Sequence, residues 1–345
     1  EKYVDFQIPF RRMKVERRKC RLRRMMHSQE RRYEMGNTLR YEGFRNVLLS
    51  QMRKRLSGKL GIKQISRREM VKNNDTVMEM LLVELEDGRV APTLYLEDLY
   101  KAYREGATLD EIIQGLCEMF TKYSAVKMPL ENKLNALIDD FEKVKPLLKF
   151  RLVNGARNKR RMEGKPFSRM GEFLLAYQIQ LGDGHGGIYA TQVTDQMLRE
   201  WGIDEAELHD IAVANMDLPQ NYLLQSMEEA IGIEVDPSVK PEDRPEMFIL
   251  TSKMKINGAT VIFSEEVRQK VGKQIGGDYY LLPSSIHEWV VIPKRCARST
   301  QEMEDMVQEV NEDAVEEEEF LSNHVYEYDV ARAQMRQAVT RAVLM

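Results

Sequence analysis

The chain has 345 residues, of which 43% are hydrophobic and 31% charged, and its formal net charge is -3. This balance is typical of folded globular proteins and excludes a wholly disordered chain, while the length allows one large or two modest domains. No apolar run approaches the ~20 residues of a membrane-spanning helix, and none follows the basic N-terminus as in a secretory signal, so we expect a cytoplasmic protein without a membrane partner.

Residues 1–35 form a basic N-terminal arm. Residues 11–32 contain eleven Lys or Arg against two Glu. Clustered cations can follow a phosphate backbone, so the arm is a candidate nucleic-acid contact if it belongs to the natural protein. The candidate residues are Arg17, Arg18, Lys19, Arg21, Arg23 and Arg24. Because no aromatic side chain lies among them to stack on bases, a disordered tail or a non-native extension is the favoured interpretation.

Capping residues mark the starts of amphipathic helices along the rest of the chain. Helices are expected at 108–123, 204–217, 264–275 and 299–311. Thr108 with Glu111 and Ser299 with Glu302 have the spacing of a capping box, in which two residues satisfy each other's backbone amides. Gly276 has the position of a left-handed C-cap after the third helix. Each helix carries an apolar stripe, so each needs a surface to cover.

Strand-like segments supply that surface. They are expected at 76–85, 90–95, 172–181, 188–193, 247–251, 260–263, 279–282 and 288–292. Turn residues at 86–88 and 182–187 favour antiparallel hairpins. We therefore predict an α+β fold, with mainly antiparallel sheets built from hairpins and packed with the amphipathic helices. The hairpin of 279–282 with 288–292 should be central, because its apolar residues are nearly continuous.

A polar, proline-rich linker at 236–245 is the best internal boundary. It divides an N-terminal α+β region, 36–235, from a C-terminal α+β region, 246–330. The last residues, 331–345, are expected to form a helical tail.

Four segments resemble a bacterial family known as domain of unknown function 5688. They lie at 90–106, 201–212, 276–288 and 321–329, the last reading LeuSerAsnHisValTyrGluTyrAsp. The resemblance spans roughly residues 40–330, and the basic arm lies outside it. It implies a bacterial, cytoplasmic, single-chain protein, and it brings no catalytic residue that can be carried over to this sequence.

The stretch 276–293 raises the question of a catalytic site, because it holds Ser284, Ser285, His287 and Glu288 between two apolar runs. An extended strand places Ser285 and His287 on one face and the other two on the opposite face. No nucleophile elbow surrounds either serine. The favoured interpretation is a structural turn, and a nucleophilic serine assisted by His287 is the catalytic alternative.

A glycine-rich loop is a weaker candidate site. Gly182, Gly184 and Gly187 match G-x-G-x-x-G, but a strand-like segment follows them instead of the helix that a dinucleotide requires. Asp183 and His185 are too few ligands for a metal. We expect a flexible hairpin here, with no metal and no cofactor.

The remaining reactive side chains have simple structural interpretations. His209 lies beside Asp210 as a helix-surface pair, and His324 lies near a strand edge. The cysteines stand singly, with neither a disulfide framework nor zinc-ligand spacing. They are Cys20, Cys117 and Cys296.

Three classes of function remain open. The favoured one is a non-enzymatic cytoplasmic protein that binds an unknown protein partner through a sheet edge or a methionine-rich helical surface, since the chain has 21 Met. The second is a hydrolase or metal-dependent enzyme that uses Ser284, Ser285 and His287. The third is nucleic-acid binding through the arm.

Overall fold

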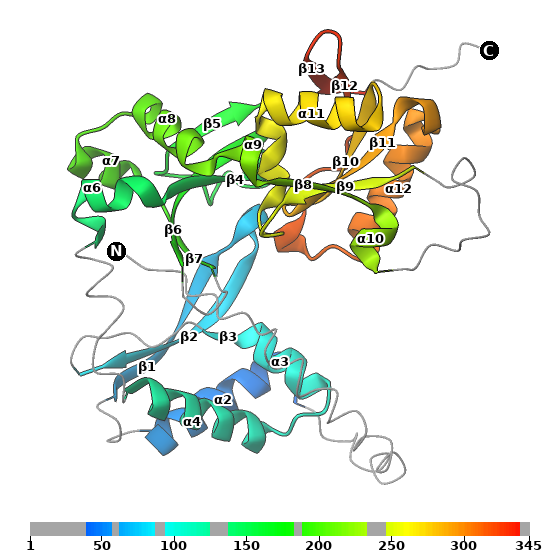
Figure 1. The fold of residues 1–345 in the computed structure, drawn as a ribbon. Helices are drawn as coiled ribbons and strands as arrows, with labels where there is room; N and C mark the ends of the chain where they lie inside the picture. Colours follow the sequence, from blue (N-terminus) through cyan, green and yellow to red (C-terminus); the bar gives the residue numbers. More distant parts are fainter. Residues whose placement is uncertain are drawn as a thin grey trace, which may run out of the picture. The chain divides into compact units, whose positions relative to one another are not determined.

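The structure, a computed structural model, describes residues 39–56, 62–86, 94–124, 137–182, 188–232 and 246–338. The arm residues Arg17, Arg18, Lys19, Arg21, Arg23 and Arg24 lie outside these ranges, as do Cys20, Asp183 and His185. The described residues combine helices with three antiparallel sheets, so the predicted α+β class is confirmed (Figure 1). Among the helices in these ranges, none is long and apolar enough to cross a membrane.

The chain divides into two compact units that alternate along the sequence. Unit 1 takes in the described residues up to Val71 and those of Val77–Lys143 and Gln180–Thr191. Unit 2 takes in Lys72–Thr76, Val144–Ile179 and the described residues from Gln192 onward.

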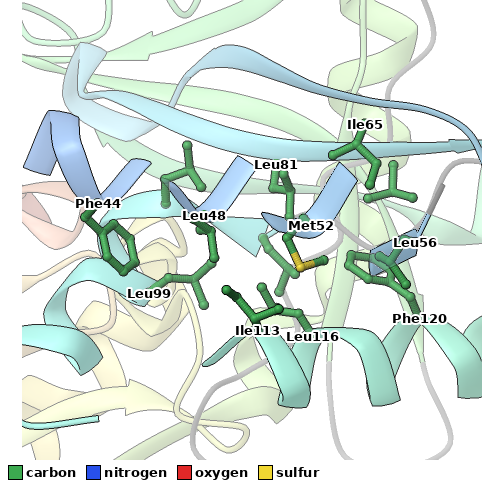
Figure 2. Packing of buried hydrophobic residues seen from close by; sticks show 13 residues of the cluster. Phe44, Leu48, Met52, Leu56, Ile65, Leu81, Leu99, Ile113, Leu116 and Phe120 are labelled. Carbon is green, nitrogen blue, oxygen red and sulfur yellow. The ribbon is translucent and has the colours of Figure 1, made fainter. Parts of the chain in front are cut away.

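Unit 1 is a small sheet covered by three helices. The helices are α2 (Tyr41–Leu56), α3 (Leu96–Arg104) and α4 (Leu109–Ser124), and the strands, in the order β1-β2-β3, are β1 (Ile62–Val71), β2 (Val77–Leu85) and β3 (Leu94–Tyr95). Phe44, Leu48 and Met52 recur every four residues along α2 and are fully buried. Figure 2 shows Phe44 beside Leu99 of α3, and Leu48 and Met52 near Leu81 of β2 and Ile113 of α4.

The start of α4 confirms the predicted capping box. The backbone N–H of Thr108 donates to Glu111 Oε2 at 2.8 Å, and the N–H of Glu111 donates to Thr108 Oγ1 at 3.2 Å. The strand predicted at 90–95 is described only at its end, where Tyr95 pairs with Met80 of β2 as an antiparallel hairpin requires.

The remaining elements begin with a four-stranded sheet, ordered β4-β6-β5 with β7 also paired to β6. Its strands are β4 (Leu148–Asn154), β5 (Phe167–Met170), β6 (Phe173–Gly182) and β7 (Ile188–Gln192), and its short preceding helices are α6 (Phe141–Val144) and η5 (Lys145–Leu147). The helices that follow are α7 (Asp195–Trp201), α8 (Glu205–Met216) and α9 (Leu218–Asn221).

The second sheet of unit 2 has six strands in the order β13-β12-β10-β11-β9-β8. The strands are β8 (Tyr222–Ser226), β9 (Phe248–Ser252), β10 (Tyr279–Ser285), β11 (Glu288–Pro293), β12 (Tyr326–Asp329) and β13 (Gln334–Gln337). The helices are α10 (Met227–Ile231), η7 (Gly258–Phe263), α11 (Glu265–Ile275), η8 (Lys294–Cys296), α12 (Thr300–Asp313) and η9 (Glu317–Glu319).

The predicted hairpin of β10 with β11 is central in this sheet and is confirmed. Leu281 pairs with Val291, and both side chains are fully buried. On this face Tyr279 donates its hydroxyl hydrogen to the carbonyl of Arg268 in α11 at 3.0 Å. On the opposite face Leu282 packs with residues of α12. Helices therefore cover both faces, as the near-continuous apolar pattern indicates.

Replacing Leu281 with Ala is expected to lower the free energy of unfolding by about 2–4 kcal/mol, because a fully buried side chain leaves a cavity in a close-packed sheet. Urea denaturation measures the change. Ser284→Ala, in the same strand and only half-buried, should change it by about 0.5 kcal/mol or less. Equal losses in the two variants would contradict a core role for this hairpin.

The caps predicted for the other helices are also present. Asp204 accepts the N–H of Glu207 at 2.8 Å, and Ser264 Oγ accepts the N–H of Val267 at 3.3 Å. Ser299 opens α12 with both halves of a capping box. Gly276 ends α11 in the left-handed region, with a φ of 82°.

Three expectations need correction. The strand expected at 260–263 is wrong: the segment is η7, which follows Asn257 in the left-handed region at a φ of 50°. The helical tail is wrong at 334–337, where β13 pairs with β12 because the sheet edge offers backbone partners. The linker at 236–245 does not separate two folded regions, since β8 before it pairs with β9 after it.

Candidate functional site

The sequence-predicted set Ser284, Ser285, His287 and Glu288 lies at the turn between β10 and β11. Ser285 Oγ accepts the backbone N–H of His287 at 3.0 Å. His287 Nδ1 accepts the N–H of Asn257 at 2.9 Å, and its Nε2 lies 3.5 Å from Glu319 Oε1. Both imidazole nitrogens and the Ser285 hydroxyl therefore hold the turn together, which is not the geometry of a nucleophile beside its base.

Two other histidines make contacts that the sequence did not suggest. His209, expected on a helix surface with Asp210, has its Nδ1 2.7 Å from the hydroxyl of Tyr177, which is 2.6 Å from Ser168 Oγ. Tyr177 is fully buried in β6, and burial raises its pKa. The hydroxyl stays protonated, and the three groups join α8 to the sheet.

His324 belongs to a polar cluster on a segment that we call the strap, residues 317–326. Ser322, His324 and Tyr326 alternate along this extended segment, so their side chains share one face. All three meet Glu172, in the turn between β5 and β6: Ser322 and Tyr326 donate to Oε1, and His324 Nδ1 lies 3.2 Å from both carboxylate oxygens.

The cluster keeps the hydroxyl of Tyr326 protonated. Burial, and then the hydrogen bond to Glu172, raises the pKa of Tyr326, which remains a donor. His324 is half-exposed at its side chain. A metal would need further ligands, and among the described residues no group of three His, Cys, Asp or Glu is placed to hold one.

Buried asparagines hold the other part of the strap. Asn74, in η4 (Asn73–Asp75), donates its side-chain amide to the carbonyls of Glu317 at 2.7 Å and Phe320 at 2.8 Å. Asn158 Oδ1 accepts the backbone N–H of Asn74, and Asn158 Nδ2 donates to Asn74 Oδ1, both at 2.9 Å. Asn74 has a φ of 59°, a left-handed conformation that asparagine tolerates better than most residues.

A cluster of cations lies in the loop between β4 and β5, residues 155–165, which we call the basic loop. It carries five cations against Glu163: Arg157, Lys159, Arg160, Arg161 and Lys165. The apolar and amide anchors of the loop point inward, since Met162 is 5% exposed and Asn158 is fully buried. Asp75 fixes the backbone by accepting the N–H of Arg160 at 2.9 Å and that of Arg161 at 2.7 Å.

The cations of the basic loop differ in exposure and in their contacts. Arg157, Lys159 and Arg160 are exposed, and Arg157 forms an ion pair with Glu317 at 2.7 Å. Lys165 is half-buried and donates to the carbonyl of Arg161. Its burial and the charges of Arg161 and Arg151 lower the pKa of Lys165 to about 8, although Asp75 acts in the opposite direction.

A family model matches residues 41–330, which include the basic loop, Glu172 and the strap. The chain belongs to the family of unknown function DUF5688. The resemblance expected over roughly 40–330 is thereby confirmed. No curated protein matches the chain, and no solved structure matches it. The basic arm precedes the range that matches DUF5688, whereas the basic loop lies well inside it.

Sequence reasoning missed both groups that the DUF5688 fold assembles. The basic loop is visible in the sequence as the run Asn158–Arg161. That run is short, and the basic arm contains more cations in total. The alternation of Ser322, His324 and Tyr326 is also visible, yet their common partner Glu172 lies 150 or more residues earlier. No local pattern connects the two.

Proposed function

We propose that this protein is a non-enzymatic binding protein and that the basic loop binds the phosphate backbone of a nucleic acid. The proposal rests on one observation: some side chains of the loop are buried and anchor it, whereas three of its cations are exposed. Met162 and Asn158 fix the loop from inside, while Lys159 and Arg160 face solvent and Arg157, also exposed, is paired with Glu317. A fixed array of exposed cations is suited to a regularly charged polyanion.

The composition of the exposed surface favours phosphate over a protein partner. A protein interface is built around an apolar or aromatic centre with a polar rim. Apart from Ala156, the exposed side chains of the basic loop are charged, and its one large apolar side chain, Met162, is buried. Nucleic-acid backbones need no apolar centre, because counterion release supplies most of the affinity.

The bacterial cytoplasm is the compartment that we propose for this activity. Cys296 is an exposed free thiol, which suits a reducing compartment. If the arm belongs to the natural protein, Arg17, Arg18, Lys19, Arg21, Arg23 and Arg24 would add contacts of the same kind.

Reversing the charge of Lys159 and Arg160 together to Glu is expected to weaken binding of a 20-nucleotide RNA at least about tenfold at 50 mM salt. The plot of log K against log salt concentration has a negative slope, and removing one cation that neutralises a phosphate should make this slope shallower by about 1. Fluorescence anisotropy over a series of salt concentrations measures both quantities.

The matched control is Lys253→Glu with Arg298→Glu, which changes the net charge equally at two exposed positions outside the loop. It should retain most of the affinity and of the salt slope. Equal losses in the two double variants, or a wild-type protein that does not bind RNA or DNA at 50 mM salt, would refute the proposed function.

A further inference from the structure

Arg157 of the basic loop lies with its guanidinium on the aromatic ring of Phe320, in the strap. Its Cζ is 3.8 Å from the centroid of that ring, which is the contact distance between two carbon atoms. An edge-on guanidinium would need room for a nitrogen between Cζ and the ring, and 3.8 Å leaves too little. One face of the planar group therefore rests on Phe320, and the other, which we call the outer face, is turned away from the ring.

The ion pair of Arg157 uses an edge of the guanidinium and leaves its outer face open. Nη1 of Arg157 donates to Glu317 Oε1 at 2.7 Å. The N–H bonds of a guanidinium lie in its plane, so a carboxylate bound to Nη1 lies beside the group and not across its face. The side chain of Arg157 is 42% exposed, whereas Phe320 is 8% exposed. Solvent therefore reaches Arg157 on the face away from Phe320.

One buried amide holds together the two segments that carry Arg157 and Phe320. Asn154 is 6% exposed, and its Oδ1 accepts the backbone N–H of Arg157 at 3.0 Å. Its Nδ2 donates to the carbonyl of Leu321 at 2.9 Å, and Asn74 donates to the carbonyl of Phe320 at 2.8 Å. The ring and the guanidinium are thus in place before a ligand arrives, so binding costs little ordering of side chains.

We infer that the outer face of Arg157 stacks against one unpaired nucleobase, and that the nucleic acid bound by the basic loop is single-stranded. The inference rests on the proposed function and names the class of its ligand. Guanidinium planes stack on flat π-systems, and the bases of single strands are free to lie on such surfaces. The bases of a duplex are already stacked on one another, so a duplex offers Arg157 only its backbone.

The charges around Arg157 separate the place of the base from that of the phosphates. Glu317 offsets the charge of Arg157, and its half-exposed carboxylate repels a phosphate placed beside it. Lys159 and Arg160 follow in the same loop and are exposed. A strand that lays a base on Arg157 therefore directs its phosphates toward Lys159 and Arg160 and away from the strap.

The test compares three probes by fluorescence anisotropy at 50 mM salt. They are the 20-nucleotide RNA as a single strand, the same RNA in a duplex, and a strand of equal length in which abasic spacers replace the bases. The abasic strand keeps every phosphate and loses every base. The wild-type protein should bind the single strand about tenfold more tightly than the abasic strand, which is the gain expected from one stacked base.

Arg157→Lys separates the planar group from its charge. The lysine can still pair with Glu317, but it has no plane on which a base can stack. This variant should bind the single strand at least about fivefold more weakly and keep the wild-type affinity for the duplex and the abasic strand. Arg298→Lys, the same exchange at an exposed position outside the loop, should leave all three affinities unchanged.

The outcomes distinguish the inference from the proposed function. Equal wild-type affinity for the single strand and the abasic strand would overturn the stacking of a base, while phosphate binding by the loop would still hold. Equal weakening of all three probes in Arg157→Lys would make Arg157 a phosphate contact and would overturn the inference as well. Failure of the wild-type protein to bind any probe would refute the proposed function and the inference that rests on it.

Discussion

Replacing Gly258 with Ala is expected to lower the free energy of unfolding by at least about 3 kcal/mol. Gly258 opens η7 against the backbones of β9 and the β10–β11 turn. A Cβ built there would lie 2.5 Å from the carbonyl oxygen of His287 and 2.5 Å from the N of Ser252, and closer still to Thr251 Oγ1. Two of these atoms belong to the backbone and cannot rotate away, so strands of the six-stranded sheet would have to move.

Urea denaturation followed by circular dichroism measures this loss, since the helices and strands of both units contribute to that signal. Gly115→Ala is the matched control, because its added Cβ meets nothing within 4 Å on the exposed face of α4. It should stabilise the protein by about 0.5–1 kcal/mol. Adding Thr251→Ala to the Gly258 variant should not restore stability, because the backbone clashes remain. Full recovery there would show that only the side-chain contact matters.

Asn158→Ala is expected to lower the free energy of unfolding by about 3–5 kcal/mol. The substitution removes the acceptor of the Asn74 N–H and the donor to Asn74 Oδ1. It also removes the donor to the carbonyl of Asn154, which lies at 2.8 Å. Each buried polar group left without a partner costs about 1–3 kcal/mol, and Asn158 is fully buried.

Lys159→Ala, at the next position and exposed, should change the same denaturation curve by about 0.5 kcal/mol or less. Asn158→Asp keeps an acceptor for the Asn74 N–H but loses both donor hydrogens, so its loss should be comparable to that of Asn158→Ala. Wild-type stability in either Asn158 variant would mean that water replaces the asparagine without penalty.

The elements that local chemistry specifies were predictable from the sequence. The capping pairs Thr108 with Glu111 and Ser299 with Glu302 fix where two helices start, and the structure has both. The continuous apolar runs at 279–282 and 288–292 likewise predict a doubly covered hairpin. In each case the determining residues lie close to one another in the chain.

The strand predicted at 260–263 is a short helix for a reason that the local sequence does not contain. Val261 and Ile262 are buried apolar β-branched residues, which a strand and a buried short helix use equally well. What decides between them is the left-handed Asn257 and the crowded Gly258, and crowding is a tertiary property. The candidate site is unpredictable for a related reason. Lys165 becomes unusual only when folding of the loop buries it, which lowers its pKa, and that burial is not visible in the sequence.

The contacts of Asn74 with the strap set the order in which unit 2 can be completed during synthesis. Its amide reaches carbonyls 243 and 246 residues later in the chain, at Glu317 and Phe320. A ribosome that adds about 5–20 residues per second needs roughly 12–50 s to make that length. Until those residues are made, Asn73 and Asn74 lack the acceptors that the finished fold gives them. A chain that ends before residue 317 would therefore lack every carbonyl that these two side-chain amides bind in the strap.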